Sequence, residues 1–174
     1  MQAKKRFGQN FLTDRKLLED LVSLIKVSDQ DKFLEIGPGK GDLTESLINL
    51  CDSYFGVEVD KDLLVFLRNK FPENKKAFID GDILKLHPSK IYSSNKFRVV
   101  GNIPYNISSP ILEWCEKHYE KIYDIHFMLQ KEFALRCAGS ERTSSYGRLS
   151  VICNYLYEVT ILKEVSKDFF NPAP

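Results

Sequence analysis

Short apolar segments that alternate with helical patterns constrain the fold of this chain more than any other feature. The segments with the length and composition of buried strands are 33–36, 54–59, 77–79, 97–100 and 125–129. Apolar residues recur at helical spacing in 14–25, 43–48, 63–67, 111–118 and 131–137. This alternation is typical of a parallel sheet covered by helices on both faces. The sequence therefore predicts an α/β fold, doubly wound, with a mostly parallel sheet.

The last part of the chain gives a weaker pattern. Residues 143–148 are polar and contain a glycine, which predicts a loop. Residues 149–156 fit either a helix or a strand, and 159–165 are predicted to form a strand because they are rich in β-branched residues. Prolines make the end of the chain irregular.

Length and composition indicate one globular domain, 1–174. The chain has 174 residues, of which 43% are hydrophobic, so it can bury a sizeable core. It shows neither a secretory h-region nor an apolar run of membrane-spanning length, so we expect no membrane association. The four cysteines form no Cys-x-x-Cys pair and the three histidines no ligand spacing. We therefore expect no metal site and a reducing location, cytoplasmic or in an organelle matrix.

A glycine-rich turn follows the first predicted strand. Gly37, Gly39 and Gly41 form G-x-G-x-G, and Asp42 stands where the dinucleotide fingerprint has its third glycine. An acidic side chain at the start of a helix repels a pyrophosphate from the positive helix end. The spacing favours a nucleotide-like cofactor without phosphates, although glycines can also simply end a strand.

Two carboxylates follow the next predicted strands. Glu58 ends the second strand, 21 positions after Gly37, where a carboxylate can accept hydrogen bonds from both ribose hydroxyls. Asp82 follows the third strand and can meet the amino group of an adenine. Each is also explained as a solvated residue at a strand end, but together with the glycine turn they indicate S-adenosylmethionine.

The segment GNIPYN, residues 101–106, follows the fourth predicted strand and has the chemistry for an aromatic amine. Asn102 offers an amide oxygen, Ile103 a backbone carbonyl held by Pro104, and Tyr105 an aromatic face. The amino nitrogen of adenine is a poor nucleophile because its lone pair is delocalised into the ring. Two acceptors that take both of its N–H groups would localise that lone pair, while Tyr105 stacks on a base turned out of its helix.

Charge says little about partners. The net charge is +1, which does not by itself indicate a nucleic-acid binder. Lys4, Lys5 and Arg6 cluster beside Phe7 and can contact phosphates, but a short basic run is also typical of a solvated tail.

In these motifs the chain resembles the ribosomal RNA adenine N6,N6-dimethyltransferases, over essentially its whole length. The segments that carry the resemblance are KRFGQNFL (5–12), EIGPGKG (35–41), GVEVD (56–60), GNIPYNISSP (101–110), FMLQKE (127–132), YGRLSV (146–151) and FNPAP (170–174). The form of YGRLSV is more similar to the housekeeping small-subunit enzymes than to the macrolide-resistance methylases, and GQNFL is similar to bacterial or organellar members.

The resemblance implies a Rossmann-like methyltransferase fold and a set of site residues. The residues implied to contact S-adenosylmethionine are Asn10, Leu12, Gly37, Glu58, Asp82 and Asn102, and Gly39 belongs to the same turn. Phe170 is implied to cover the second face of the target adenine, although it also fits a core aromatic of a terminal strand. Lys4, Lys5, Arg6 and Arg148 are expected to contact RNA phosphates, with Arg136 and Arg142 as further candidates that equally fit ordinary surface charge.

The resemblance also sets the limits of the prediction. Family members continue past FNPAP into a further strand and a small helical domain, so we expect this chain to be the catalytic part of a longer protein, a monomer acting on small-subunit ribosomal RNA. Two alternatives are a non-catalytic RNA-binding assembly factor that keeps the cofactor fold and a large-subunit resistance methylase. A nicotinamide-dependent oxidoreductase is disfavoured by the glycine spacing and by GNIPYN.

Overall fold

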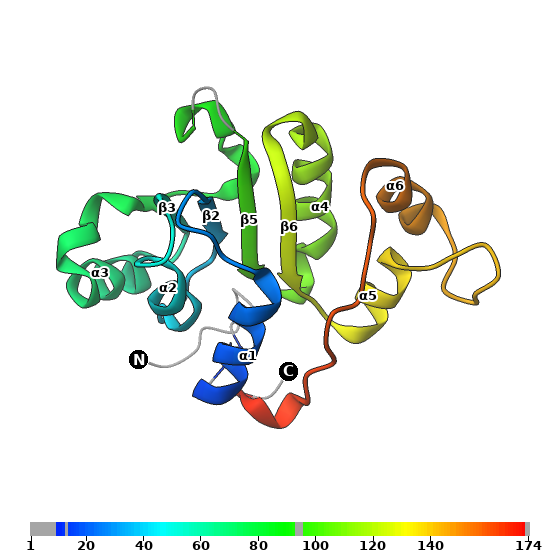
Figure 1. Cartoon of the computed structure of the whole chain (residues 1–174), viewed down its shortest axis with the longest axis horizontal. Coiled ribbons are helices and arrows are strands. Elements are labelled where there is room, and N and C mark those ends of the chain that lie inside the picture. Colours follow the sequence, from blue (N-terminus) through cyan, green and yellow to red (C-terminus); the bar gives the residue numbers. More distant parts are fainter. Residues whose placement is uncertain (1–9, 13, 93–95, 173–174) are drawn as a thin grey trace.

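A five-stranded sheet forms the centre of the computed structural model, which describes residues 10–12, 14–92 and 96–172. Its order is β4-β3-β2-β5-β6, and every neighbouring pair is parallel (Figure 1). The strands are β2 (Lys32–Ile36), β3 (Ser53–Glu58), β4 (Phe78–Asp80), β5 (Phe97–Asn102) and β6 (Ile122–Met128). The chain reverses its direction of winding between β2 and β5, and in such sheets ligands bind beside the carboxyl ends of the strands at that point.

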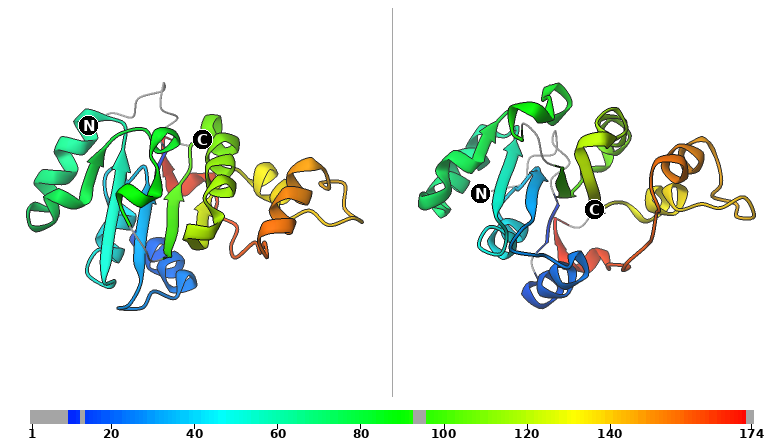
Figure 2. Two further views of the ribbon diagram at one scale, coloured as in Figure 1. Left: turned by 90° about the horizontal axis from the view of Figure 1, so that it is seen from above. Right: turned by 45° about the horizontal axis from the view of Figure 1, so that its top comes forward.

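Helices cover both sides of the sheet (Figure 2). The α-helices are α1 (Arg15–Ile25), α2 (Asp42–Leu47), α3 (Lys61–Lys70), α4 (Ser108–Lys117), α5 (Lys131–Cys137) and α6 (Arg148–Leu156). Short 3₁₀ turns are η2 (Pro72–Ala77), η3 (Ile83–Lys85), η4 (Pro88–Lys90), η5 (Tyr105–Ile107), η6 (Tyr119–Lys121) and η7 (Lys167–Phe169). Asp14 is the N-cap of α1, since its carboxylate accepts from Leu17 N at 2.7 Å.

Two apolar clusters fill the two faces of the sheet because successive strand residues point to opposite sides. On β2, Phe33 belongs to the cluster under α1, α2 and α3, and Leu34 to the cluster under α4. On β5, Val100 belongs to the cluster that contains Phe33, and Val99 to the cluster that contains Leu34. All four are fully buried. The predicted doubly wound α/β fold is therefore confirmed.

Arg98 on β5 joins the sheet to the end of α1. Its guanidinium donates to Asp31 Oδ2 at 2.6 Å, to Asp124 Oδ2 on β6 at 2.8 Å and to the Ile25 carbonyl at 2.6 Å. It also lies over the ring of Phe33, 5.1 Å from the centroid. A single side chain thus binds two carboxylates and the carbonyl end of a helix, where positive charge is favourable.

A second, two-stranded antiparallel sheet pairs the beginning and end of the described chain. In it β1 (Phe11–Leu12) lies against β7 (Phe170–Asn171), with Leu12 opposite Phe170. The pairing brings the described ends of the segments 5–12 and 170–174, which carry the family resemblance, side by side.

In the last part of the chain, the structure resolves one open prediction and corrects another. Residues 149–156, left open between helix and strand, belong to α6, which begins at Arg148. The strand predicted at 159–165 is wrong, because these residues join neither sheet. β-Branched composition favours a strand only where a neighbouring strand supplies hydrogen-bond partners. This segment instead returns from α6, and Lys163 reaches Asp20 of α1 at 2.8 Å.

Among the residues that the structure describes, no helix has the length and apolar character required to cross a membrane.

Candidate active site

One large cavity, of about 1440 Å³, lies at the carboxyl ends of the parallel strands. Every predicted catalytic and cofactor residue lines it: Asn10, Leu12, Gly37, Gly39, Glu58, Asp82, Asn102, Ile103, Pro104, Tyr105 and Phe170. These residues come from β1, β7 and the ends of β2, β3, β4 and β5. The topology therefore collects motifs from the whole chain at one edge of the sheet.

The glycine turn after β2 adopts a conformation that suits glycine. Gly37 and Gly39 have φ values of 65° and 63°, in the left-handed region. A Cβ at Gly39 would lie 3.1 Å from Cε1 of Phe11, so β1 packs directly on the turn. The Gly37 amide donates to the Val57 carbonyl at 2.9 Å, which joins the turn to β3.

Gly39→Ala is expected to weaken cofactor binding about 10-fold or more, because it combines a left-handed penalty of roughly 1–2 kcal/mol with displacement of the Phe11 ring. Titration calorimetry with S-adenosylhomocysteine measures the loss. Gly147→Ala is the matched control, since Gly147 is extended and a Cβ there meets nothing within 4 Å. Equal affinity in the two variants would contradict the role of the turn.

Glu58 lies at the end of β3 and is buried, with 4% of its surface exposed. Its Oε2 accepts from the Gly39 amide at 3.1 Å and its Oε1 from the Asp60 amide at 2.9 Å. Burial raises the pKa of Glu58, while these backbone hydrogen bonds act in the opposite direction. Each carboxylate oxygen has a second lone pair, so the held carboxylate can also accept from the two hydroxyls of a ribose.

Asp82 stands two residues after β4 and starts η3. Its Oδ1 accepts from the Leu84 amide at 3.0 Å, and its Oδ2 lies 3.8 Å from Lys85 Nζ. The carboxylate is thereby oriented at the cavity wall, beside the exposed Leu84. A carboxylate can accept from an amino group at the edge of a purine, and a neighbouring apolar side chain can cover the face of the ring.

Asn102 ends β5 and its amide has one orientation. Its Nδ2 donates to the Asn10 carbonyl at 2.7 Å. Because only the nitrogen of the amide can donate, Oδ1 is turned away from that carbonyl. No described residue donates to Oδ1, which stays available as an acceptor. The beginning of the chain thus orients the central residue of the GNIPYN motif.

The rest of GNIPYN is held at the rim of the cavity. The Ile103 amide donates to the Met128 carbonyl of β6 at 3.0 Å. The Pro104 carbonyl accepts from Ile107 N at 3.1 Å and from Ser108 Oγ at 3.2 Å, so it is used by the fold itself. Tyr105 is 59% exposed, which leaves its ring open to a ligand that enters from solvent. Phe170 on β7 is partly buried and lines the same cavity.

Sequence reasoning missed several residues of the cavity wall. Phe11 packs on the glycine turn, and Val59 and Leu84 lie directly beside Glu58 and Asp82. Apolar residues next to a polar site residue are a signal that could have identified the last two. Glu35 was included only as the first letter of the glycine motif.

Glu35 is a carboxyl group inside the protein, 2% exposed. Its Oε2 accepts from Thr44 Oγ1 of α2 at 2.7 Å and from the Tyr54 hydroxyl of β3. Burial raises the pKa of Glu35 to about 7, although both hydrogen bonds lower it. The carboxyl therefore titrates near neutral pH.

The free energy of unfolding of the wild type is expected to fall as the pH rises, and this fall should be smaller in Glu35→Gln, which has no carboxyl group at this position. A pKa that folding raises from 4.5 to about 7 stabilises the folded state below pH 4.5, and this contribution is lost as the pH rises through 7. The change is on the order of 3 kcal/mol. Urea unfolding of both proteins at pH 5 and pH 8 measures it. Glu45→Gln, at an exposed position of α2, is the control, and parallel pH curves for wild type and Glu35→Gln would contradict the assignment.

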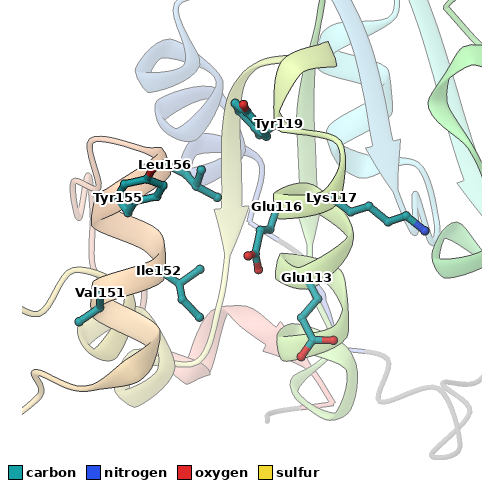
Figure 3. Close-up of a pocket in the computed structure, with 8 residues that line it drawn as sticks. All are labelled: Glu113, Glu116, Lys117, Tyr119, Val151, Ile152, Tyr155 and Leu156. Carbon is teal, nitrogen blue, oxygen red and sulfur yellow. The ribbon is translucent and has the colours of Figure 1, made fainter.

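Among the described residues, the predicted RNA contact Arg148 lies away from the cavity. Arg148 begins α6, is exposed, and is absent from the cavity wall. Lys4, Lys5 and Arg6 lie outside the described residues. A smaller hollow of about 590 Å³ lies between α4 and α6, lined by residues such as Glu116 and Tyr155 (Figure 3). It contains none of the predicted site residues. In the described part of the chain, no group of three or more His, Cys, Asp or Glu side chains is placed to hold a metal ion.

Comparison with known proteins gives a consistent result. The model of the family described as ribosomal RNA adenine dimethylase matches residues 1–174. The chain is 42% identical to ribosomal RNA small subunit methyltransferase A of Methylobacillus flagellatus, over 99% of this chain and 67% of that protein. It therefore spans about two thirds of the length of this relative.

Two crystal structures have a similar fold. A dimethyladenosine transferase from Plasmodium falciparum superposes with a TM-score of 0.79 at 28% identity, covering 94% of this chain and 59% of that one. The 23S rRNA methyltransferase ErmE gives a TM-score of 0.78 at 30% identity, covering 95% of this chain and 65% of that one.

Fold and cavity together define a Rossmann-like methyltransferase of the class that uses S-adenosylmethionine. Within this class, the chain belongs to the ribosomal RNA adenine dimethylase family.

Proposed function

We propose that this chain transfers methyl groups from S-adenosylmethionine to the N6 amine of adenines in small-subunit ribosomal RNA, two on each target nitrogen. The observation that carries the proposal is the orientation of Asn102. The Asn10 carbonyl holds its amide nitrogen, and its oxygen is left as an acceptor on the wall of the cavity that also contains the glycine turn and Glu58. A cofactor site and an acceptor for an aromatic amine thus share one space.

The residues at the glycine turn fit the cofactor. Glu58 would accept from the ribose hydroxyls and Asp82 from the adenine amino group, while Val59 and Leu84 would cover the base. Acidic groups around the turn suit a ligand that carries positive charge and no phosphate. When bound, the cofactor supplies an electrophilic methyl carbon.

The chain's own residues would then act on the adenine by positioning and electrostatics. Asn102 Oδ1 and the Ile103 carbonyl would accept the two N–H groups, which draws the nitrogen lone pair out of the ring and stabilises the positive charge that develops on nitrogen. Tyr105 would stack on one face of the everted base, with Phe170 on the other. Holding the amine about 3 Å from the methyl carbon, in line with the bond that breaks, removes much of the entropic barrier.

The small subunit is favoured as the source of the RNA because the relative with 42% identity is named as a small-subunit enzyme, whereas ErmE, named for 23S RNA, is 30% identical. A cytoplasmic monomer remains our expectation. A non-catalytic assembly factor that binds the cofactor is the second candidate, because a protein can bind the cofactor in this cavity without transferring its methyl group.

Mass spectrometry of nucleosides tests the proposal. Unmethylated small ribosomal subunits and, in parallel, unmethylated large subunits are incubated with the chain and isotopically labelled cofactor. We expect labelled N6,N6-dimethyladenosine from the small subunits alone. Label in the large subunits alone would assign the chain to the resistance branch, and binding of cofactor without label in either would identify the assembly factor. Calorimetry should detect S-adenosylhomocysteine but not NAD, and preferential NAD binding would overturn the cofactor.

A further inference from the structure

Side chains of α6 bind the carbonyl end of α5, and the two helices pack against each other (Figure 1). Ser150 Oγ donates to the Arg136 carbonyl at 2.6 Å, and Asn154 Nδ2 donates to the Gly139 carbonyl at 2.9 Å. A Cβ added at Gly139 would lie 2.7 Å from Ser150 Oγ, so the end of α5 approaches α6 closely. One face of α6 therefore satisfies carbonyl groups that the end of a helix leaves without partners.

This contact brings two cysteines together. Helical spacing places Cys153 on the same face of α6 as Ser150 and Asn154. Cys137 is the last residue of α5 and lies between the two carbonyls that this face binds. The side chains of Cys137 and Cys153 are hydrogen-bonded to each other, and both are free thiols. The fold thus builds a dithiol that no Cys-x-x-Cys motif announces in the sequence.

Both thiols of this dithiol border the large cavity. Cys137 is 5% exposed and Cys153 is 7% exposed, and both belong to the cavity wall. A small molecule that enters the cavity can therefore reach two sulfur atoms that are otherwise buried. Cys115 of α4 differs, because it has no exposed surface, and burial, followed by the neighbouring Cys153, raises its pKa to about 12. Cys115 is therefore protected from reagents.

The hydrogen bond makes the two sulfur atoms unequal. It lowers the pKa of Cys153, against the effects of burial and of Glu116. The same bond, together with burial, raises the pKa of Cys137 despite the nearby Arg136. This direction agrees with the position of Cys137 at the carbonyl end of α5, where negative charge is unfavourable. Because the thiolate is the reactive form of cysteine, Cys153 is the sulfur that reacts first.

We propose that Cys137 and Cys153 form a redox-active dithiol, which hydrogen peroxide entering the cavity oxidises to a disulfide between α5 and α6. The Cys153 thiolate attacks one peroxide oxygen and the O–O bond breaks, while the hydroxide that leaves takes up the proton that Cys153 has lost. Cys137 then attacks the sulfur of the resulting sulfenic acid, the S–S bond forms and the S–O bond breaks, and a second water leaves with the Cys137 proton. The two sulfur atoms together lose two electrons, which the peroxide gains.

The surroundings of the dithiol permit this bond. A disulfide is about 2 Å long, shorter than a hydrogen bond between thiols, so the sulfur atoms must move together. Cys137 ends α5 and can move without displacing a following helical turn. A sulfenic acid at Cys153 is uncharged, so the thiolate that held the Cys137 proton is then gone. Disulfides in reducing compartments are mostly transient, and this site, which is independent of the proposed function, suits that behaviour.

Peptide mapping of the oxidised chain tests the proposal, because trypsin places each cysteine in a different peptide. These peptides are 41–61, 99–117, 137–142 and 149–163. The folded, reduced chain is treated with hydrogen peroxide at neutral pH, the remaining thiols are blocked with iodoacetamide, and linked peptides are identified by mass spectrometry. We expect 137–142 linked to 149–163 as the principal disulfide, and dithiothreitol should restore both thiols. In concentrated urea the same treatment should yield mixed pairs, since the contact between α5 and α6 is absent.

Variants separate the two steps of the oxidation. Cys137→Ala lacks the thiol that resolves the sulfenic acid, so dimedone should trap the sulfenic acid at Cys153. Cys153→Ala should give at least ~10-fold less dimedone adduct, because the remaining thiol of Cys137 is buried at the carbonyl end of a helix. Cys51→Ala is the control, since Cys51 lies between α2 and β3, and it should form the same disulfide in the same yield as wild type.

Several results would overturn the proposal. A link between 99–117 and 149–163 would assign the reactive pair to Cys115 and Cys153 instead. Disulfides between chains, or irreversible oxidation of Cys153 without a disulfide, would show that the two thiols do not react with each other. An equal yield of the linked pair in urea would show that the folded structure does not create the site. If a variant does not fold, as judged by circular dichroism, the peptide map of the wild type decides.

Discussion

Asn102→Ala should lower the rate of methyl transfer about 10²-fold or more while the domain stays folded. The variant removes the acceptor that stabilises the charge developing on the adenine nitrogen. It removes little from the core, since Asn102 is only partly buried at the end of β5. Single-turnover transfer of labelled methyl groups to unmethylated small subunits measures the rate, and calorimetry with S-adenosylhomocysteine measures the cofactor affinity.

Two further variants sharpen this result. Asn69→Ala, at an exposed position of α3, is the control and should transfer methyl groups at the wild-type rate. Asn102→Asp keeps an acceptor oxygen but cannot donate to the Asn10 carbonyl, which lies 2.7 Å from the amide nitrogen. It should also be slow, because the orientation is lost and a negative charge faces the carbonyl. A wild-type rate in Asn102→Ala would remove Asn102 from the mechanism.

Arg98→Met should destabilise the fold by roughly 3–5 kcal/mol, the cost of removing one partner from a buried ionic network. The Arg98 side chain is 8% exposed, and its loss leaves the Asp31 and Asp124 carboxylates and the Ile25 carbonyl without their donor. Urea unfolding at pH 7 measures the difference. The control is Arg15→Met, since Arg15 is 93% exposed beside Glu19 and should contribute less than about 1 kcal/mol.

The destabilisation caused by Arg98→Met should also depend on pH. Burial raises the pKa of Asp124, but hydrogen bonds from His126 and Arg98 outweigh it and lower the pKa below its ordinary value of 3.8. A lowered pKa stabilises the folded state above pH 3.8, and the contribution is lost as the pH falls through the folded-state value. The difference between wild type and Arg98→Met should therefore shrink in acid. A difference below 1 kcal/mol at pH 7 would show that methionine packing replaces the network.

The fold class was predictable because its signals are local. Neighbouring residues alone define the apolar runs of β2, β3 and β5. They also define the helical spacing of α1, α3 and α4. The glycine turn was predictable for the same reason, since G-x-G-x-G specifies the backbone of a single loop. The segment at 159–165 shows the limit, because a strand exists only when another strand pairs with it.

The contacts that organise the candidate site are long-range and could not be predicted. The pairing of Leu12 with Phe170 and the bond from Asn102 to the Asn10 carbonyl join opposite ends of the chain. The two hydrogen bonds to Glu35 Oε2 likewise depend on where α2 and β3 pack.

The sequence by itself determined the order of strands and helices, the glycine turn and the residue types at each strand end, because periodicity and backbone preference act between neighbours. Only the tertiary structure decided that the amide nitrogen of Asn102 donates to the Asn10 carbonyl, that Glu35 Oε2 accepts from Thr44, and how Arg98 joins β5, β6 and α1. A hydrogen bond has a direction that depends on the position of its partner, and that position is set when distant segments pack.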